Sequence, residues 1–118
     1  MNFKVNLQEL KSPFYFEETV SYARQNLGID FQKSGKFYVA ICPVHSGKKP
    51  SFYLHTATAT GRVRFTCFSD KCNGSWDIFA LIQEREGCNF ITAVKRFGQY
   101  LGIDEIVLPH GNIIKTSE

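Results

Sequence analysis

The sequence predicts an α+β fold in which a small antiparallel sheet is flanked by one N-terminal and two C-terminal helices. Three observations support this prediction. Residues 36–66 contain three short segments rich in aromatic and β-branched residues, which favour strands. Apolar residues recur at helical spacing before and after these segments. Two short pairs of metal-binding side chains are also separated by a span long enough for two strands, and one bound ion would tie the strand ends together.

The first helix is expected to begin at Ser12-Pro13 and to end at Gly28, because proline suits the first turn of a helix and glycine the position after its last. Its apolar residues recur at i, i+4, i+7 and i+11, which places Phe16, Val20, Ala23 and Leu27 on one face. We expect this helix to serve packing.

Three strands are predicted over residues 36–41, 51–55 and 62–66, after a connector at residues 29–34. In the third, Val63 is expected to face inward and Arg62, Arg64 and Thr66 outward, because side chains alternate along a strand. Phe52 and Phe65 are expected in the core rather than on the surface.

Two more helices are predicted after the strands. Ser75 is expected to cap the first, whose residues 76–82 are apolar nearly all round. Asn89 is expected to cap the second, which ends at Gly102. Residues 104–118 show no periodicity, so they are expected to form a linker or disordered tail after a domain of residues 1–103.

The ligand pairs are Cys42 with His45 and, after 21 residues, Cys67 with Cys72. Three thiolates and one imidazole form a closed tetrahedral set, which is typical of a structural zinc site. The sequence therefore predicts a zinc ribbon that holds one Zn²⁺. Cys72 is the least typical ligand, because four residues separate it from Cys67, and His55 is the alternative ligand if this wide pair fails.

Disulfides are another possible role for four cysteines. No export signal opens the sequence, so a reducing cytoplasm is expected. Buried free thiols would not explain the histidine three residues after Cys42; Cys88 alone is expected to be such a thiol. No apolar run reaches the length of a membrane span, so no membrane partner is expected.

The net charge of +3 is unevenly distributed. Residues 31–75 contain seven Lys or Arg and one acidic residue, a net charge of +6, whereas both flanking parts are net negative. Basic and aromatic residues interleave here, as in proteins that bind single-stranded nucleic acid. For any one cation, a solvated surface charge is an equal alternative. The predicted contacts, with the tyrosines stacking on bases, are Lys36, Tyr38, Lys48, Lys49, Tyr53, Arg62, Arg64 and Lys71.

Several motifs resemble the N-terminal zinc-binding domain of bacterial DnaG-type DNA primases. They are Cys42-Pro43-Val44-His45, Pro50-Ser51-Phe52, Phe65-Thr66-Cys67-Phe68, Cys72-Asn73-Gly74 and Asp77-Ile78-Phe79. The resemblance runs in collinear order over about residues 15–102. The wide last cysteine pair and the loss of glycines around it indicate a divergent member.

The resemblance implies a domain that binds single-stranded DNA template and helps to select the start site of primer synthesis. It implies no catalytic residues here, because primer synthesis takes place in a separate Toprim-type polymerase domain, in the same chain or in trans. A replicative helicase is a further implied partner. The alternative function is a stand-alone zinc ribbon that binds DNA or a protein, as an accessory factor of a phage, plasmid or integrated element.

Overall fold

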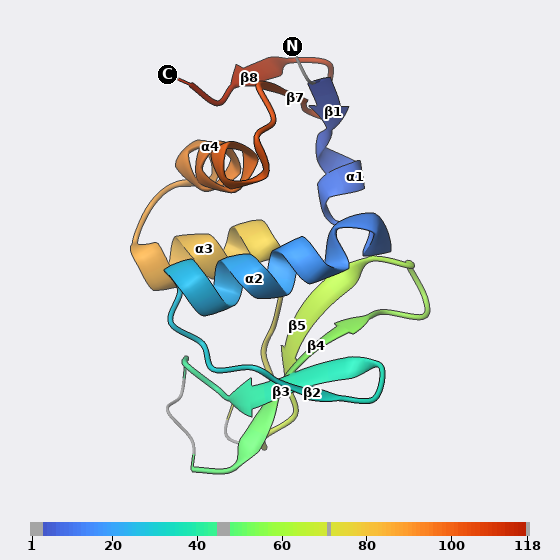
Figure 1. Ribbon diagram of the computed structural model, residues 1–118, viewed down its shortest axis with the longest axis vertical. Helices are drawn as coiled ribbons and strands as arrows, with labels where there is room; N and C mark the ends of the chain where they lie inside the picture. The colour runs from blue at the N-terminus through green and yellow to red at the C-terminus, as the bar shows by residue number, and fades with distance from the viewer. Residues whose placement is uncertain (1–3, 45–47, 71, 118) are drawn as a thin grey trace.

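The computed structural model describes residues 4–44, 48–70 and 72–117, which form two sheets and four α-helices. The larger sheet has the strand order β2-β3-β4-β5-β6 and occupies the lower half of Figure 1. Helices α2 and α3 lie above this sheet, and α4 lies beyond them. A smaller sheet of order β1-β7-β8 occupies the opposite end of the molecule, close to both termini.

The five strands of the larger sheet are all antiparallel to their neighbours. The three predicted strands are confirmed as β3 (Phe37–Ile41), β4 (Pro50–Thr56) and β5 (Val63–Cys67). Two edge strands, β2 (Gln32–Ser34) and β6 (Ser75–Trp76), were not predicted, because segments of two or three residues are too short to show a period. The predicted connector at residues 29–34 therefore contributes β2.

The helices are α1 (Leu7–Leu10), α2 (Phe16–Asn26), α3 (Ile78–Glu86) and α4 (Phe90–Leu101), and a 3₁₀ helix (Pro13–Tyr15) precedes α2. The predicted caps of α4 are confirmed: Asn89 Oδ1 accepts a hydrogen bond from the Thr92 N–H at 2.8 Å, and Gly102 follows with a φ of 75°.

The predicted cap of α3 is wrong. Ser75 pairs with Thr66 in the sheet, and Asp77 caps the helix instead by accepting a hydrogen bond from the Ala80 N–H at 2.7 Å. The second Asp77 carboxylate oxygen lies 3.1 Å from the Lys11 ammonium, and the Lys11 carbonyl accepts from the Val63 N–H. The end of α1, the start of α3 and the start of β5 therefore meet at this point.

The core lies between the inner face of the larger sheet and the helices. Phe31, Phe52 and Phe65 stack there with ring centroids 5.8–5.9 Å apart, which confirms the inward prediction for Phe52 and Phe65. Phe79 of α3 and Phe97 of α4 continue the buried aromatic cluster toward the smaller sheet.

The C-terminal residues differ from the linker or disordered tail that the sequence predicted. They contain β7 (Glu105–Val107) and β8 (Ile113–Lys115), and β7 also pairs in parallel with β1 (Lys4–Asn6). Ile106 and Ile114 are buried, and Thr116 Oγ1 donates to the Ile103 carbonyl. The sequence does not predict these strands, because each has only three residues and β1, the partner of β7, lies about a hundred residues away in the sequence.

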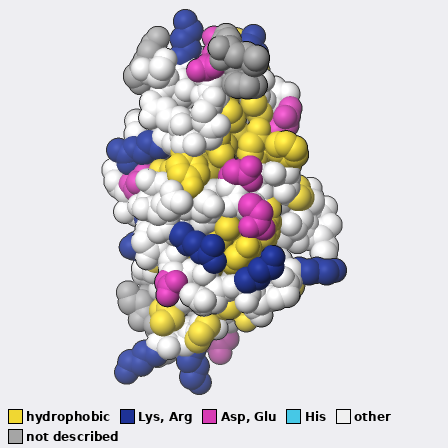
Figure 2. Space-filling model, viewed as in Figure 1, with side chains coloured by type: hydrophobic (Ala, Val, Ile, Leu, Met, Phe, Trp, Pro, Cys, Tyr) yellow, Lys and Arg dark blue, Asp and Glu magenta, His cyan; other side chains and the backbone are white. Residues whose placement is uncertain are grey.

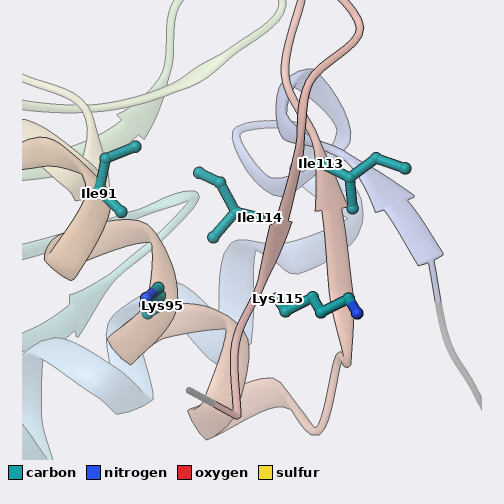
Figure 3. A pocket seen from close by; sticks show the side chains of 5 residues that line it. All are labelled: Ile91, Lys95, Ile113, Ile114 and Lys115. Carbon is teal, nitrogen blue, oxygen red and sulfur yellow. The ribbon is translucent and has the colours of Figure 1, made fainter.

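The packing of β8 onto α4 is visible from close by. Figure 3 shows Ile114 pointing toward α4, where Ile91 and Lys95 line one side of a shallow hollow, whereas Ile113 points away from the helix. Ile113 is 47% exposed. The two neighbouring isoleucines of β8 therefore face opposite environments.

Within the part of the chain that the structure describes, no helix has the length and apolar character needed to cross a bilayer.

Replacing Ile106 by alanine tests whether the C-terminal strands belong to the folded unit. Loss of this fully buried side chain should lower the free energy of unfolding by about 2–4 kcal/mol. The matched control, Ile113→Ala, should change it by less than about 0.5 kcal/mol, because that side chain is exposed. Urea denaturation of the zinc-loaded protein, followed by circular dichroism, measures both. Equal stability of Ile106→Ala and the wild type would contradict the packing described here.

Candidate metal centre and nucleic-acid interface

Three cysteines converge at one end of the larger sheet. Cys42 directly follows β3, Cys67 is the last residue of β5, and Cys72 lies in the loop between β5 and β6. Since β3 and β5 are both antiparallel to the intervening β4, they run in the same direction and finish at the same end of the sheet. The strand order therefore brings together two ligands that are 25 positions apart in the sequence.

The three thiols have the geometry of a metal site. Their sulfur atoms all lie within 4.8 Å of one another, and the Cys42 and Cys72 Sγ atoms are 4.0 Å apart. Four ligands at the usual Zn–S distance in a tetrahedron would place sulfur atoms about 3.8 Å apart. Cys42 and Cys67 are fully buried, and Cys72 is partly buried. The cluster can therefore hold one Zn²⁺ with little rearrangement.

The surroundings of Cys67 favour the thiolate that zinc requires. Burial alone would raise the pKa of this thiol, but hydrogen bonds from the Ser69 backbone, the Ser51 hydroxyl and the other two cysteines outweigh it and lower the pKa. The Ser51 Oγ atom lies 3.6 Å from the Cys67 sulfur. A thiol with a lowered pKa loses its proton to a metal more readily.

The wide gap between Cys67 and Cys72 is accommodated by a compact turn. The N–H groups of Cys72 and Asn73 both donate to the Ser69 carbonyl, at 3.1 and 2.9 Å. Asn73 adopts a left-handed conformation with a φ of 51°, after which the Gly74 carbonyl accepts from the Cys67 N–H at 2.9 Å. Gly74 is required here, because a Cβ atom at this position would overlap the Trp76 indole.

The fourth predicted ligand, His45, lies outside the described residues, and its role stays a prediction. The alternative ligand, His55, is excluded from the thiol cluster. It lies on β4, and its Nε2 atom is 2.9 Å from the Thr66 hydroxyl on the face of the sheet that points away from the helices. His55 as a replacement ligand is therefore wrong, and the three thiols are the ligands that the described residues bring together.

The face of the larger sheet away from the helices, which we call the outer face, carries three aromatic rings. Phe37 and Phe68 are 43% and 61% exposed, and Tyr53 between them is partly exposed. The ring centroid of Tyr53 lies 6.2 Å from that of Phe37 and 5.4 Å from that of Phe68. We call these three residues the aromatic row.

Tyr53 was among the predicted contact residues, whereas Phe37 and Phe68 were not. Two signals could have identified them. Side chains alternate between the two faces of a strand. Phe37 is an odd number of positions from the buried Ala40 and Cys42, and Phe68 directly follows the buried Cys67, so both rings face outward. Neither signal is decisive without knowing which face of the strand is buried.

Tyr38 was predicted to stack on bases, and this prediction is wrong. Tyr38 pairs with Leu54 on the inner face and is only 6% exposed. Its hydroxyl donates to Glu17 at 2.8 Å, which together with burial raises its pKa, and the guanidinium of Arg24 lies 5.1 Å from its ring. Tyr38 pairs with Leu54, which directly follows Tyr53 in β4, and neighbouring residues of a strand face opposite sides. Tyr38 and Tyr53 therefore lie on opposite faces of the sheet.

The predicted cations differ in their surroundings. Lys48 and Lys49 are exposed at the metal end of the sheet, and Lys36 and Arg62 are exposed at the other end. Arg64 lies between these ends and donates two hydrogen bonds to the Ser75 hydroxyl. Lys71 lies outside the described residues. Lys and Arg side chains project from the half of the molecule that contains this sheet, including its lower tip (Figure 2).

Replacing Cys72 by serine tests the third thiol as a ligand. The wild-type protein should contain one zinc per chain, and Cys72→Ser should lose tight zinc binding because one thiolate is removed. Cys88→Ser is the matched control, since Cys88 lies outside the cluster. Atomic absorption after dialysis against a weak chelator gives the zinc content. Full zinc retention by Cys72→Ser would show that this thiol is not a ligand.

Comparisons with known proteins agree with this geometry. Residues 6–109 match the CHC2 zinc finger family of the DnaG zinc ribbon type. The chain is 33% identical over 98 residues to a DNA primase of Thermotoga maritima, which covers 83% of the chain and 15% of the relative. It is 35% identical over 78 residues to a DNA primase of Enterococcus faecalis, which covers 64% and 12%.

A DNA primase of Geobacillus stearothermophilus is 28% identical over 96 residues, which covers 75% of the chain and 15% of that relative. The chain thus spans less than a sixth of the length of these curated relatives. On the family match and the thiol cluster, the chain belongs to the CHC2 zinc finger family, as a divergent form of the zinc-binding domain of DnaG-type DNA primases.

Proposed function

We propose that this chain is the zinc domain of a DNA primase that binds single-stranded template on its outer face and helps to select the start site of primer synthesis. One observation carries the proposal. The aromatic row lies open on the outer face, and exposed cations stand at both ends of the sheet that bears it.

The aromatic row suits a single strand because unpaired bases offer their faces for stacking, whereas a duplex hides them. Stacking on an aromatic side chain contributes about 1–3 kcal/mol per base and tolerates any base. The rings of Phe37 and Phe68 are each nearly perpendicular to that of Tyr53, at 84° and 71°. The row therefore offers rings in two orientations, so that a base can stack on one ring and place its edge against the face of the next.

The cations supply the sequence-independent part of binding. A DNA strand that crosses the outer face along the aromatic row would meet Lys48 and Lys49 near the metal centre and would approach Lys36 and Arg62 at the other end of the sheet. Contacts with phosphates release counterions and make affinity strongly dependent on salt.

The metal would have a structural role in this function. Phe68 follows Cys67 directly, and its N–H donates to the Ser51 carbonyl at 2.9 Å, next to the sulfur cluster. A zinc bound by the thiols would hold this segment and so fix the most exposed ring of the aromatic row. Zinc binding would also add folding free energy to a small core.

Primer synthesis itself is assigned in this proposal to a Toprim-type polymerase domain, in the same chain or in trans. A replicative helicase is a further expected partner, and the expected location is the cytoplasm. The relatives named DNA primase support the assignment of template and polymerase domain.

A second candidate function is that of an accessory factor that binds a protein. It is favoured by exposed apolar side chains on α4 and β8, namely Phe90, Ile91 and Ile113. The two functions are separable because this patch lies on elements that contribute nothing to the outer face.

Replacing Phe68 by alanine tests the aromatic row. Fluorescence anisotropy with labelled oligonucleotides should show tighter binding of single-stranded than duplex DNA, and Phe68→Ala should weaken the former about 5- to 150-fold, the equivalent of one stacked base. Phe14→Ala is the matched control, because Phe14 is exposed on the 3₁₀ helix. Equal binding of both DNA forms, unchanged by Phe68→Ala, would contradict the proposal, and no binding of either form would favour the accessory function.

Replacing Lys49 by alanine tests the phosphate contacts. The logarithm of affinity for a single strand should fall with the logarithm of salt concentration, with a slope of about −0.7 per phosphate neutralised. Lys49→Ala should make this slope shallower by about 0.7 and weaken binding to all sequences alike. A slope that matches the wild type would show that Lys49 is only a solvated charge.

A further inference from the structure

Beside the aromatic row, the outer face carries a chain of hydrogen-bonded polar side chains, His55, Thr66, Ser75 and Arg64, which we call the polar network. His55 Nε2 lies 2.9 Å from Thr66 Oγ1, which lies 3.4 Å from Ser75 Oγ. The Nε and Nη2 atoms of Arg64 donate to the same Ser75 hydroxyl at 3.2 and 3.1 Å. The network spans three adjacent strands, β4, β5 and β6.

The sheet register builds this network. Thr66 pairs with Ser75, and Arg64 pairs with His55, so the four side chains occupy neighbouring positions on one face. A hydroxyl oxygen has two lone pairs, and the Ser75 oxygen uses both to accept from Arg64. The hydroxyl proton of Ser75 is then left to point toward Thr66. The Arg64 guanidinium is therefore held in one plane by two hydrogen bonds.

The fixed guanidinium still has free donors. Of its five N–H groups, Ser75 uses two, and no other hydrogen bond of this guanidinium is seen among the described residues, which leaves one N–H on Nη2 and two on Nη1. No carboxylate of the described residues lies within ion-pair distance of Arg64. A rigid fork of parallel N–H donors matches the O6 and N7 acceptors of guanine, the commonest specific contact of arginine with a base.

The aromatic row and the polar network meet at His55. His55, the cross-strand partner of Arg64, has its ring centroid 6.2 Å from that of Phe68, which in turn contacts Tyr53. A base stacked on Phe68 can therefore present its edge toward β5. We propose that Arg64, oriented by Ser75, reads a guanine in the single strand and so contributes to the choice of binding sequence, rather than neutralising a phosphate.

This inference rests on the proposed function, because it needs a single strand on the outer face. Holding the side chain in place before binding lowers the entropic cost of forming the contact. Ser75 is a positioning residue in this account, and Arg64 is the residue that touches the base.

The test measures anisotropy with oligothymidylate probes that carry one central guanine, adenine or 7-deazaguanine. The wild type should prefer guanine over adenine by at least about fivefold, because a good bidentate contact discriminates by that much or more. 7-Deazaguanine, which lacks the N7 acceptor, should lose most of this preference. Binding that is tight but indifferent to the central base would overturn the inference and leave the proposed function standing.

Variants separate base reading from charge. Arg64→Lys keeps the charge but loses the fork, so it should abolish the guanine preference while the salt slope stays unchanged. Ser75→Ala should also reduce the guanine preference. Lys49→Ala, the matched control, should make the salt slope shallower but keep the guanine preference. Zinc content and circular dichroism confirm that each variant folds.

Retention of the guanine preference by Arg64→Lys would overturn the inference. If the wild type binds none of the probes at low salt, the proposed function fails, and the inference fails with it.

Discussion

The convergence of three thiols at one end of the larger sheet is the constraint on which the rest of the structure depends. It follows from the strand order, because β3 and β5 run in the same direction on either side of β4 and deliver Cys42 and Cys67 to the same place. The turn that follows β5 then returns Cys72 to them, closed by the Ser69 carbonyl. A metal bound here would join the end of β3, the end of β5 and the approach to α3.

The same alternation of side chains builds both the core and the binding face. Every second residue in β5 and in the middle of β4, such as Phe65 and Phe52, is buried against the helices, and the residues between them form the outer face. A short domain thus needs no separate element for recognition. The cost is that aromatic side chains such as Phe37 and Phe68 remain exposed to water, which is unusual unless a partner covers them.

The ligand spacing, the three central strands and the caps of α4 could be predicted because their signals are local. The face on which Tyr38 lies could not, since it depends on the pairing of β3 with β4 and on which face of the sheet the helices cover. Ser75 was assigned to a helix because a short edge strand has no periodicity. The strands after residue 104 depend on β1 at the other end of the chain, and no local pattern encodes that contact. The polar network likewise exists only through the register of β4, β5 and β6.

The central claim is that a single DNA strand lies on the outer face of the larger sheet. The most direct measurement is NMR of the aromatic side chains of the zinc-loaded protein, titrated with a short single-stranded oligonucleotide. The account predicts that the ring resonances of Phe37, Tyr53 and Phe68 shift on binding, while that of Tyr38, on the opposite face of the same sheet, does not. Shifts confined to α4 and β8, with the aromatic row unchanged, would contradict it.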